Sequence, residues 1–210
     1  MSDEAPRLFL ITPPLAEASR FVPLLEAALA AASVACLLVR TSTRDEGEIK
    51  AIFKILAPMA QTRGTACLVE HESRIAARAD ADGVHMAGVG PELEEAITAM
   101  RPDRIVGVGG LSGRDAAMEA GEAGVDYLMF GGPDDAETHE SIRERVEWWA
   151  EIFNVPCVGY ARDPALAGEL AQAGAEFIAL CDGLWDKPEA IAATLAAVHR
   201  AIQPVGEAVR

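Results

Sequence analysis

The chain has 210 residues, of which 50% are hydrophobic and only 5% aromatic, so we expect one domain with a core of aliphatic side chains. Its formal net charge of −15 argues against nucleic acid and anionic membranes as partners, because an acidic surface repels their phosphates. A phosphorylated small molecule remains open as a ligand, since it responds to a local pocket more than to the net charge.

The N-terminal segment and the cysteines indicate a cytoplasmic protein. The apolar run near the N-terminus is too short for a signal peptide, and acidic residues stand where positive charge belongs. No apolar stretch approaches the roughly 20 residues that a membrane helix needs. The four cysteines are Cys36, Cys67, Cys157 and Cys181. They form no C-x-x-C pair and lie in apolar runs, so we expect buried reduced thiols.

From the N-terminus onward, short apolar runs alternate with amphipathic segments. The apolar runs predict eight strands that begin close to Arg7, Val34, Thr65, Asp82, Asp103, Asp126, Val155 and Glu176. The intervening segments predict helices over residues 15–32 and 45–61, a short helix that reaches residue 79, helices that start at Pro91, at Ser112 or Asp115, at Pro164 and at Pro188, and one that contains Trp148 and Trp149. Eight strand–helix units are therefore expected.

The three runs between Ala81 and Gly132 carry the strongest signal. They read DGVHMAG, RIVGVGG and DYLMFGG, and glycine ends each of them. Unbroken apolar runs of this length suit strands that are buried on both faces, as in a parallel sheet. Glycine lets the backbone turn sharply or approach a ligand closely. Ligands of parallel α/β folds lie at the carboxyl ends of the strands, so we expect the site there.

The alternation predicts an α/β protein with a single-domain (β/α)8 TIM barrel over residues 1–204 and a frayed C-terminal tail at residues 205–210. A doubly wound open sheet is the competing architecture. It is less favoured because no G-x-G-x-x-G follows the first strand, and no Gly/Ser-rich or Pro-rich linker divides the chain.

These runs, together with LFLIT, VPCVG and EFIAL, resemble the thiamine phosphate synthase family, which also includes a thiazole tautomerase branch. The most specific pieces are ADGVHMAG and IVGVGGLSGRDAAMEAGEAGVDYLMFGG. The resemblance implies an enzyme that joins hydroxymethylpyrimidine diphosphate to a thiazole phosphate while Mg²⁺ holds the pyrophosphate. Pyrophosphate would leave first, and the thiazole nitrogen would capture the pyrimidine carbocation. Such chemistry needs cations around the leaving group.

Several positions that the resemblance assigns to the metal carry other side chains here. Of the Gln-x-Arg-x-Lys pattern after the second strand, only Arg40 is kept. Glu70 and His71 stand where the family has Asn-Asp, and Gly90 stands where it has a second metal-binding Asp. Without carboxylates at the positions of His71 and Gly90, we expect the Mg²⁺ site of the family to be absent or much weakened.

The phosphate-binding positions differ as well. Gly109 replaces a serine, and Arg162 replaces the second glycine of a Gly-Gly that cradles the thiazole phosphate. The Thr-x-Thr-Lys that grips pyrophosphate keeps only Thr138, with His139 in place of the lysine. The acidic loop of Asp134, Asp135 and Glu137 disfavours a pyrophosphate there. A weak anion site is expected instead on the amides near Gly183, with Arg162 as its cationic arm.

The candidate site combines these positions with the glycine-rich strand ends. The acid–base candidates are His139, His71 and Glu70; the phosphate-binding candidates are Arg40, Thr138, Gly159, Arg162 and Gly183; the pocket scaffold is His85, Gly109 and Gly131. His85 has two readings, a hydrogen-bonded core histidine or a catalytic group. The rim residues Glu70, His71 and His139 also have two, solvated loop side chains or ligands of a divalent metal, and we assign no metal site.

Three functions therefore stay open. The first is a transferase of thiamine biosynthesis, with Mg²⁺ as its cofactor if the family activity is retained. The second is a thiazole phosphate tautomerase or isomerase, which needs one acid–base group such as His139 or His71. The third is a non-catalytic binding or regulatory protein that retains a small-molecule pocket. In each case the partner is a phosphorylated small molecule, and one of Trp148 and Trp149 could serve a homodimer contact.

Overall fold

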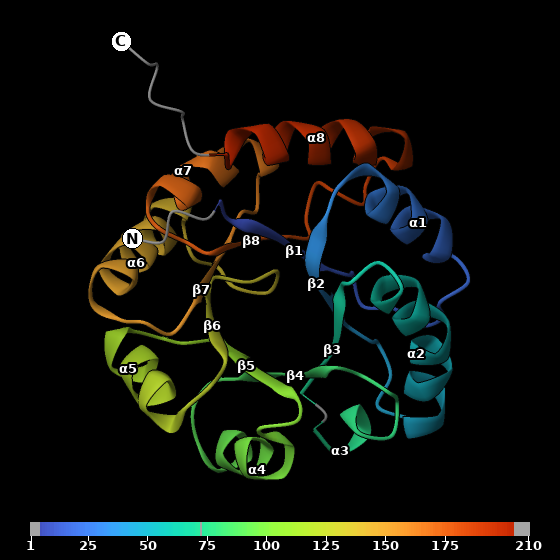
Figure 1. Cartoon of the computed structure of the whole chain (residues 1–210), viewed down its shortest axis with the longest axis horizontal. Coiled ribbons are helices and arrows are strands. Elements are labelled where there is room, and N and C mark those ends of the chain that lie inside the picture. The colour runs from blue at the N-terminus through green and yellow to red at the C-terminus, as the bar shows by residue number, and fades with distance from the viewer. Residues whose placement is uncertain (1–4, 72, 204–210) are drawn as a thin grey trace.

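Eight apolar runs form parallel strands that pair in sequence order and close into a barrel surrounded by helices, as Figure 1 shows. The computed structural model describes residues 5–71 and 73–203. The strands are β1 (Arg7–Ile11), β2 (Val34–Val39), β3 (Ala66–Glu70), β4 (Gly83–Ala87), β5 (Ile105–Gly109), β6 (Tyr127–Phe130), β7 (Cys157–Tyr160) and β8 (Phe177–Leu180). The predicted (β/α)8 barrel is thus confirmed. The predicted tail at residues 205–210 lies outside the described residues.

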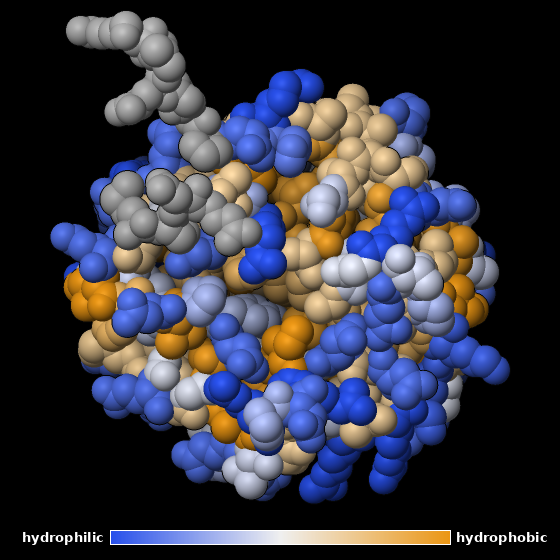
Figure 2. Space-filling model, viewed as in Figure 1, coloured by the Kyte–Doolittle hydropathy of each residue, from blue (hydrophilic) through white to orange (hydrophobic). Residues whose placement is uncertain are grey.

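The helices follow the strands in regular alternation. They are α1 (Val22–Ala31), α2 (Glu46–Gln61), α3 (Ser73–Ala76), α4 (Pro91–Met100), α5 (Arg114–Ala123), α6 (His139–Ile152), α7 (Ala167–Gln172) and α8 (Ile191–Ala201), with the short 3₁₀ helices η1 (Pro164–Leu166) and η2 (Pro188–Ala190) before the last two. Hydrophilic residues are spread over the outer surface, with hydrophobic ones visible between them (Figure 2).

Local sequence signals set most helix ends. The side chain of Asp45 accepts a hydrogen bond from Glu48 N at 3.0 Å and caps α2. Pro91 opens α4, where its missing N–H leaves no bond unmade. Gly124 ends α5 in the left-handed region at φ 87°, which a residue with a side chain rarely adopts. Ser73 is the first residue of α3.

The first helix is shorter than predicted. We expected it over residues 15–32, but α1 begins at Val22. Leu15 donates a hydrogen bond to the carbonyl of Arg40 and accepts one from Ser42 N, at 3.0 and 2.9 Å. This parallel bridge extends the β1–β2 pairing beyond the strands and takes up backbone groups that a helix would need.

Carboxylates brace the amino-terminal end of the barrel in a repeated pattern. The residue just before each of β4, β6 and β8 is acidic, and its carboxylate accepts a backbone N–H from the first or second residue of the preceding strand. These bonds run from Cys67 N to Asp82 at 2.7 Å, from Val106 N to Asp126 at 2.8 Å, and from Cys157 N to Glu176 at 2.9 Å. The three acidic residues therefore hold the scaffold at the end opposite the site.

The four cysteines are free and buried, as the sequence predicted. Burial raises the pKa of the Cys181 thiol to about 12 and raises the pKa of the other three thiols as well. Trp149 is also buried, and half-buried Trp148 packs edge-on against it. Within the described residues, no helix is both long enough and apolar enough to cross a membrane.

Candidate functional site

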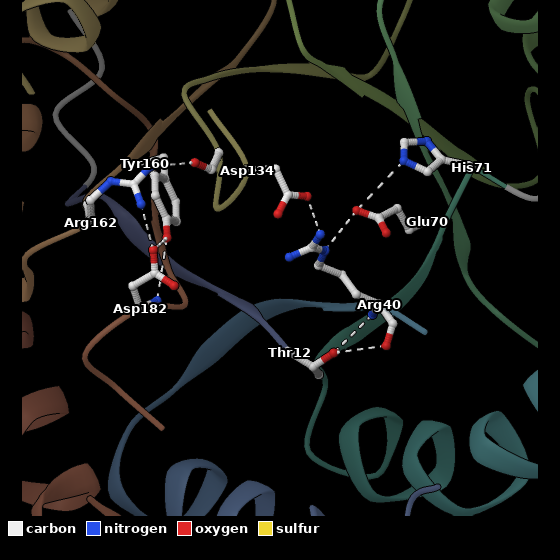
Figure 3. A network of polar contacts seen from close by, with 9 residues as sticks. Thr12, Arg40, Glu70, His71, Asp134, Tyr160, Arg162 and Asp182 are labelled. Atoms are coloured by element: carbon white, nitrogen blue, oxygen red, sulfur yellow. Dashed lines mark hydrogen bonds and ion pairs between the residues drawn. The ribbon is translucent and has the colours of Figure 1, made fainter. Parts of the chain in front are cut away.

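The carboxyl ends of the strands form a mouth in which Arg40 is the central cation. Arg40 follows β2, and its backbone N–H donates to the buried hydroxyl of Thr12, which follows β1, at 2.9 Å. Its guanidinium lies between two carboxylates (Figure 3). Nε donates to Glu70 Oε1 at 3.0 Å, and Nη2 donates to the carboxylate of Asp134. The mouth therefore joins residues from β1, β2, β3 and the loop after β6.

The charge of Arg40 is already balanced. The side chain of Arg40 is only 9% exposed, whereas that of Asp134 is 79% exposed. A buried cation needs compensation, which Glu70 supplies from inside the barrel and Asp134 supplies from the solvent side. A phosphate that binds Arg40 must therefore compete with these two carboxylates.

A second cluster lies across the mouth, after β7 and β8. Arg162 Nη1 donates to Asp182 Oδ2 at 2.9 Å, and the Tyr160 hydroxyl donates to the same oxygen at 3.0 Å (Figure 3). Burial raises the pKa of Tyr160, so its hydroxyl stays protonated and can donate. Arg162 also donates through Nη2 to the carbonyls of Gly132 and Asp135, at 3.2 and 2.5 Å. One guanidinium thus connects the loops after β6, β7 and β8.

The β6–α6 loop, residues 131–138, is fastened by three arginines from different elements. Arg40 binds the side chain of Asp134, and Arg162 binds two of the loop's carbonyls. Arg145 of α6 pairs with Glu137 and donates to the carbonyl of Leu111 at 2.7 Å. Two of the three carboxylates of the predicted acidic loop, those of Asp134 and Glu137, are therefore paired with arginines of the same chain.

The predicted acid–base residues do not all meet. Glu70 and His71 lie together at the mouth, with 3.8 Å between Glu70 Oε1 and His71 Nε2. His71 has φ 61° and a half-exposed side chain. His139 instead opens α6 and lies 3.2 Å from Glu169 of α7. His139 therefore pairs with a residue of the outer helical layer, and no contact among the described residues joins it to Glu70 or His71.

Of the remaining predicted phosphate-binding residues, Gly183 lies beside the β7 loop, whereas Gly159 and Thr138 contact helices. Gly183, at φ 73°, lies beside the β7 loop, 3.9 Å from the carbonyl of Arg162 when a Cβ is placed on it. Gly159 lies inside β7, where an added Cβ would face Leu170 of α7 at 3.2 Å. The Thr138 hydroxyl accepts a hydrogen bond from Ser141 N at 3.2 Å and caps α6. Its side chain is thus already used by the helix.

One backbone amide at the start of η1 already has a hydrogen-bond acceptor. The carboxylate of Asp163 accepts a hydrogen bond from Ala165 N at 2.9 Å. An anion in the β7 loop would compete with this carboxylate as well as with Asp182. At the Gly183 turn, Asp182 N donates to the Tyr160 hydroxyl at 3.4 Å and Leu184 N donates to the Cys181 carbonyl at 3.3 Å, so among the described residues only the Gly183 N–H of this turn is left for an anion.

The three predicted scaffold residues lie within or directly after neighbouring strands. His85 of β4 is 6% exposed, and Gly109 is the last residue of β5. Gly131 follows β6 with φ 77°, and an added Cβ would stand 2.4 Å from the side chain of Ile142. Gly131 therefore serves both a left-handed turn and close packing of α6.

Sequence reasoning missed three members of the mouth. Thr12 directly follows the first apolar run, which is the signal that could have indicated a rim position. Tyr160 ends β7 and was assigned only to the strand. Asp134 was recognised as acidic, but its pairing with Arg40 spans 94 positions of the chain and leaves no local pattern.

The side chains do not fit the Mg²⁺ site that the resemblance implies. Across residues 5–71 and 73–203, no group of three or more His, Cys, Asp or Glu side chains is arranged to hold a metal ion. The carboxylates nearest to Arg40 are Glu70 and Asp134, and both are bonded to its guanidinium. Hard divalent cations need several oxygen ligands in one place, so we derive no step through Mg²⁺.

A closed parallel barrel with charged groups gathered at the carboxyl ends of its strands defines a TIM-barrel protein. The thiamine monophosphate synthase family matches residues 8–184, and the chain belongs to this family. It is 37% identical to the thiamine-phosphate synthase of Rhodospirillum centenum, over 94% of this chain and 98% of that protein. It is 33% identical to the thiamine-phosphate synthase of Hyphomonas neptunium, over 92% of both.

Solved structures agree on the fold. Thiamine phosphate pyrophosphorylase from Pyrococcus furiosus superimposes with a TM-score of 0.77 at 24% identity, covering 94% of this chain and 95% of that one. At this identity the likeness concerns the barrel itself.

Proposed function

We propose that the protein binds a phosphorylated thiamine precursor, a thiazole phosphate, at the carboxyl ends of its strands. The observation that carries this proposal is the pair of guanidiniums at the mouth, Arg40 after β2 and Arg162 after β7, both bonded to the β6–α6 loop. Guanidinium groups bind phosphate oxygens through directed, charge-assisted hydrogen bonds. Membership of the family supplies the class of ligand.

The phosphate would lie on the Arg162 side of the mouth. The Gly183 turn lies beside this arginine and would offer the N–H of Gly183, and Arg162 is half-exposed. Asp182 opposes the binding because its carboxylate already accepts from Arg162 at 2.9 Å. A weak site, occupied at millimolar phosphate, is therefore expected, and Arg162→Ala should weaken it about tenfold, or roughly 1.4 kcal/mol.

We propose further that the altered side chains reduce the metal-assisted handling of pyrophosphate. Support comes from His71 and Gly90, which stand where the family resemblance implies metal-binding carboxylates, and from Arg40, whose charge two carboxylates already balance. A pyrophosphate leaving group needs concentrated positive charge. The protein's own cations supply it only after an internal ion pair has opened.

A second candidate function is the coupling of the two thiamine precursors. The observation in its favour is the 37% identity to a thiamine-phosphate synthase over nearly the whole of both chains. In that reaction the residues described here would bind and orient the thiazole phosphate, while the fastened β6–α6 loop would keep water from the mouth. Isomerisation of a thiazole phosphate is a third chemistry for the same pocket. It needs one acid–base group, and His71 beside Glu70 is the histidine available at the rim.

The deciding experiment follows thiazole phosphate binding by calorimetry and product formation by chromatography. Both precursors are supplied with and without Mg²⁺. Binding without thiamine phosphate formation supports the proposal, whereas Mg²⁺-dependent turnover assigns the coupling reaction and contradicts the reduced metal function. Arg143→Ala is the matched control for Arg162→Ala, because Arg143 lies on α6 and bonds Glu140 at 2.6 Å, outside the mouth network. Absence of binding by the wild-type protein at millimolar ligand would remove the proposal.

A further inference from the structure

Two rings inside the barrel form a buried polar pair that none of the family-derived roles explains. His85 of β4 and Tyr127 of β6 are each 6% exposed. Their rings are stacked at 19° with centroids 5.7 Å apart, and His85 Nδ1 lies 2.8 Å from the Tyr127 hydroxyl. The pair extends across the strand between them, β5, so three neighbouring strands take part.

Gly107 and Gly109 of β5 leave the space that these two rings occupy. A Cβ on Gly107 would stand 2.0 Å from the ring of Tyr127, and a Cβ on Gly109 would stand 2.7 Å from His85 Nε2. No side chain larger than hydrogen fits at either position unless a ring moves. Gly109 thus lets the imidazole of His85 lie directly over the backbone of β5.

The hydrogen-bond partners decide where the protons are. Burial raises the pKa of Tyr127 well above its usual value and lowers the pKa of His85 to about 3, so both groups are neutral at physiological pH. Within the described residues, the Tyr127 hydroxyl bonds only His85 Nδ1. If Nδ1 carried the proton, the buried hydroxyl would have no acceptor for its own, which is unfavourable. The hydroxyl therefore donates to Nδ1, and the imidazole proton is on Nε2.

The Nε2 end is directed toward the mouth. It lies over Gly109, the last residue of β5, and the carbonyl of His85 accepts a hydrogen bond from His71 N at 2.8 Å. His71 and Arg40 at the mouth are close enough to lower the pKa of His85 further, after burial. The imidazole thus lies directly beneath the charged network of the site.

We propose that His85 presents a fixed Nε2–H donor in the floor of the mouth, and that Tyr127 is the positioning residue that selects this tautomer. The group that it binds is an uncharged acceptor, such as a ring nitrogen of a heteroaromatic ligand. A neutral imidazole brings no charge with which to compensate a desolvated phosphate, and the guanidiniums above it serve that purpose. The ligand part of this inference rests on the proposed function, because it assigns the ring end of the same molecule.

The tautomer can be measured without any ligand. Nitrogen NMR of the histidine side chains, with His85 assigned from the spectrum of His85→Gln, should show the proton on Nε2 in the wild-type protein. Tyr127→Phe should convert this signal to a mixture of tautomers, whereas Tyr160→Phe, which removes the other tyrosine hydroxyl of the chain, should leave it unchanged. A wild-type signal from Nδ1–H would overturn the inference, and this measurement does not require the tyrosine variant to fold.

Binding then tests the ligand part with two probes, thiazole phosphate and inorganic phosphate. His85→Gln should weaken thiazole phosphate about tenfold, and Tyr127→Phe should weaken it less, in proportion to the Nε2–H population that NMR shows to be lost. Both variants should leave inorganic phosphate within twofold of the wild type. Equal loss for both probes would overturn the assignment of His85 to the ring. If the wild-type protein binds neither probe, the proposed function and the ligand part both fail, while the tautomer is still decided by NMR.

Discussion

Replacing Asp134 by asparagine should strengthen oxyanion binding at the mouth. The substitution keeps the size of the side chain and removes the charge that Arg40 Nη2 now contacts. Two unit charges about 4 Å apart interact by about 4 kcal/mol at an effective dielectric constant of 20. The side chain of Asp134 is 79% exposed, however, so the value of an exposed ion pair, about 0.2–1 kcal/mol, applies instead. Such an energy corresponds to a gain in phosphate affinity of at most about fivefold.

The assay is calorimetric titration of inorganic phosphate and pyrophosphate at low and at high ionic strength. The gain should shrink as salt is added, because exposed charges are screened. Asp135→Asn is the matched control. It removes the same charge one residue away, while the backbone carbonyl that accepts from Arg162 is retained. Equal gains in both variants would show only a general loss of negative field, and weaker binding by Asp134→Asn would refute the competition between this carboxylate and phosphate.

Three further outcomes are expected. Asp126→Ala removes the acceptor of Val106 N in β5 and should lower the free energy of unfolding by about 1–3 kcal/mol in denaturant titrations. Asp103→Ala changes an exposed residue and should have little effect. Gly107→Ala should overpack the barrel and lower the free energy of unfolding by about 1–3 kcal/mol, because its Cβ would stand 2.0 Å from the ring of Tyr127. Gly113→Ala, whose Cβ would have no atom within 4 Å, should be tolerated in the same assay. The pKa of His85 is lowered to about 3, so between pH 6.5 and 3 only the unfolded chain protonates this imidazole. The free energy of unfolding should therefore decrease by up to about 1.4 kcal/mol for each unit by which the pH is lowered in this range. His85→Gln should lack this contribution.

The fold could be predicted because its signals are local. Each strand is an unbroken apolar run, and Asp45, Pro91 and Gly124 mark helix ends through their own backbone and side-chain chemistry. The start of α1 could not be predicted. It depends on hydrogen bonds between Leu15 and the end of β2, and no pattern within the segment itself reports a partner so far along the chain.

The site could be predicted only in part. The family resemblance placed Arg40 and Glu70 at a common rim, and they lie 3.0 Å apart there. Thr138 ends the expected loop and His139 begins α6, but competing partners, a helix amide and Glu169, take up their side chains. Gly109 is predicted as part of the pocket scaffold, and the tertiary structure fills the space above it and above Gly107 with rings of neighbouring strands. Which group fills such a space is decided by strands whose relative positions the sequence does not state.

The carboxylate braces at the amino-terminal end also divide the barrel into units. Each brace joins an odd-numbered strand to the even-numbered strand that follows it, through Asp82, Asp126 and Glu176. The first pair, β1–β2, has Ser33 at the corresponding position, and its pairing shifts register between Leu8 and Phe9. A half-barrel that ends after α4 and one that begins at β5 would each keep all their own braces. A division of the chain between α4 and β5 would therefore break none of the three braces, although it would separate the five paired positions of β4 and β5.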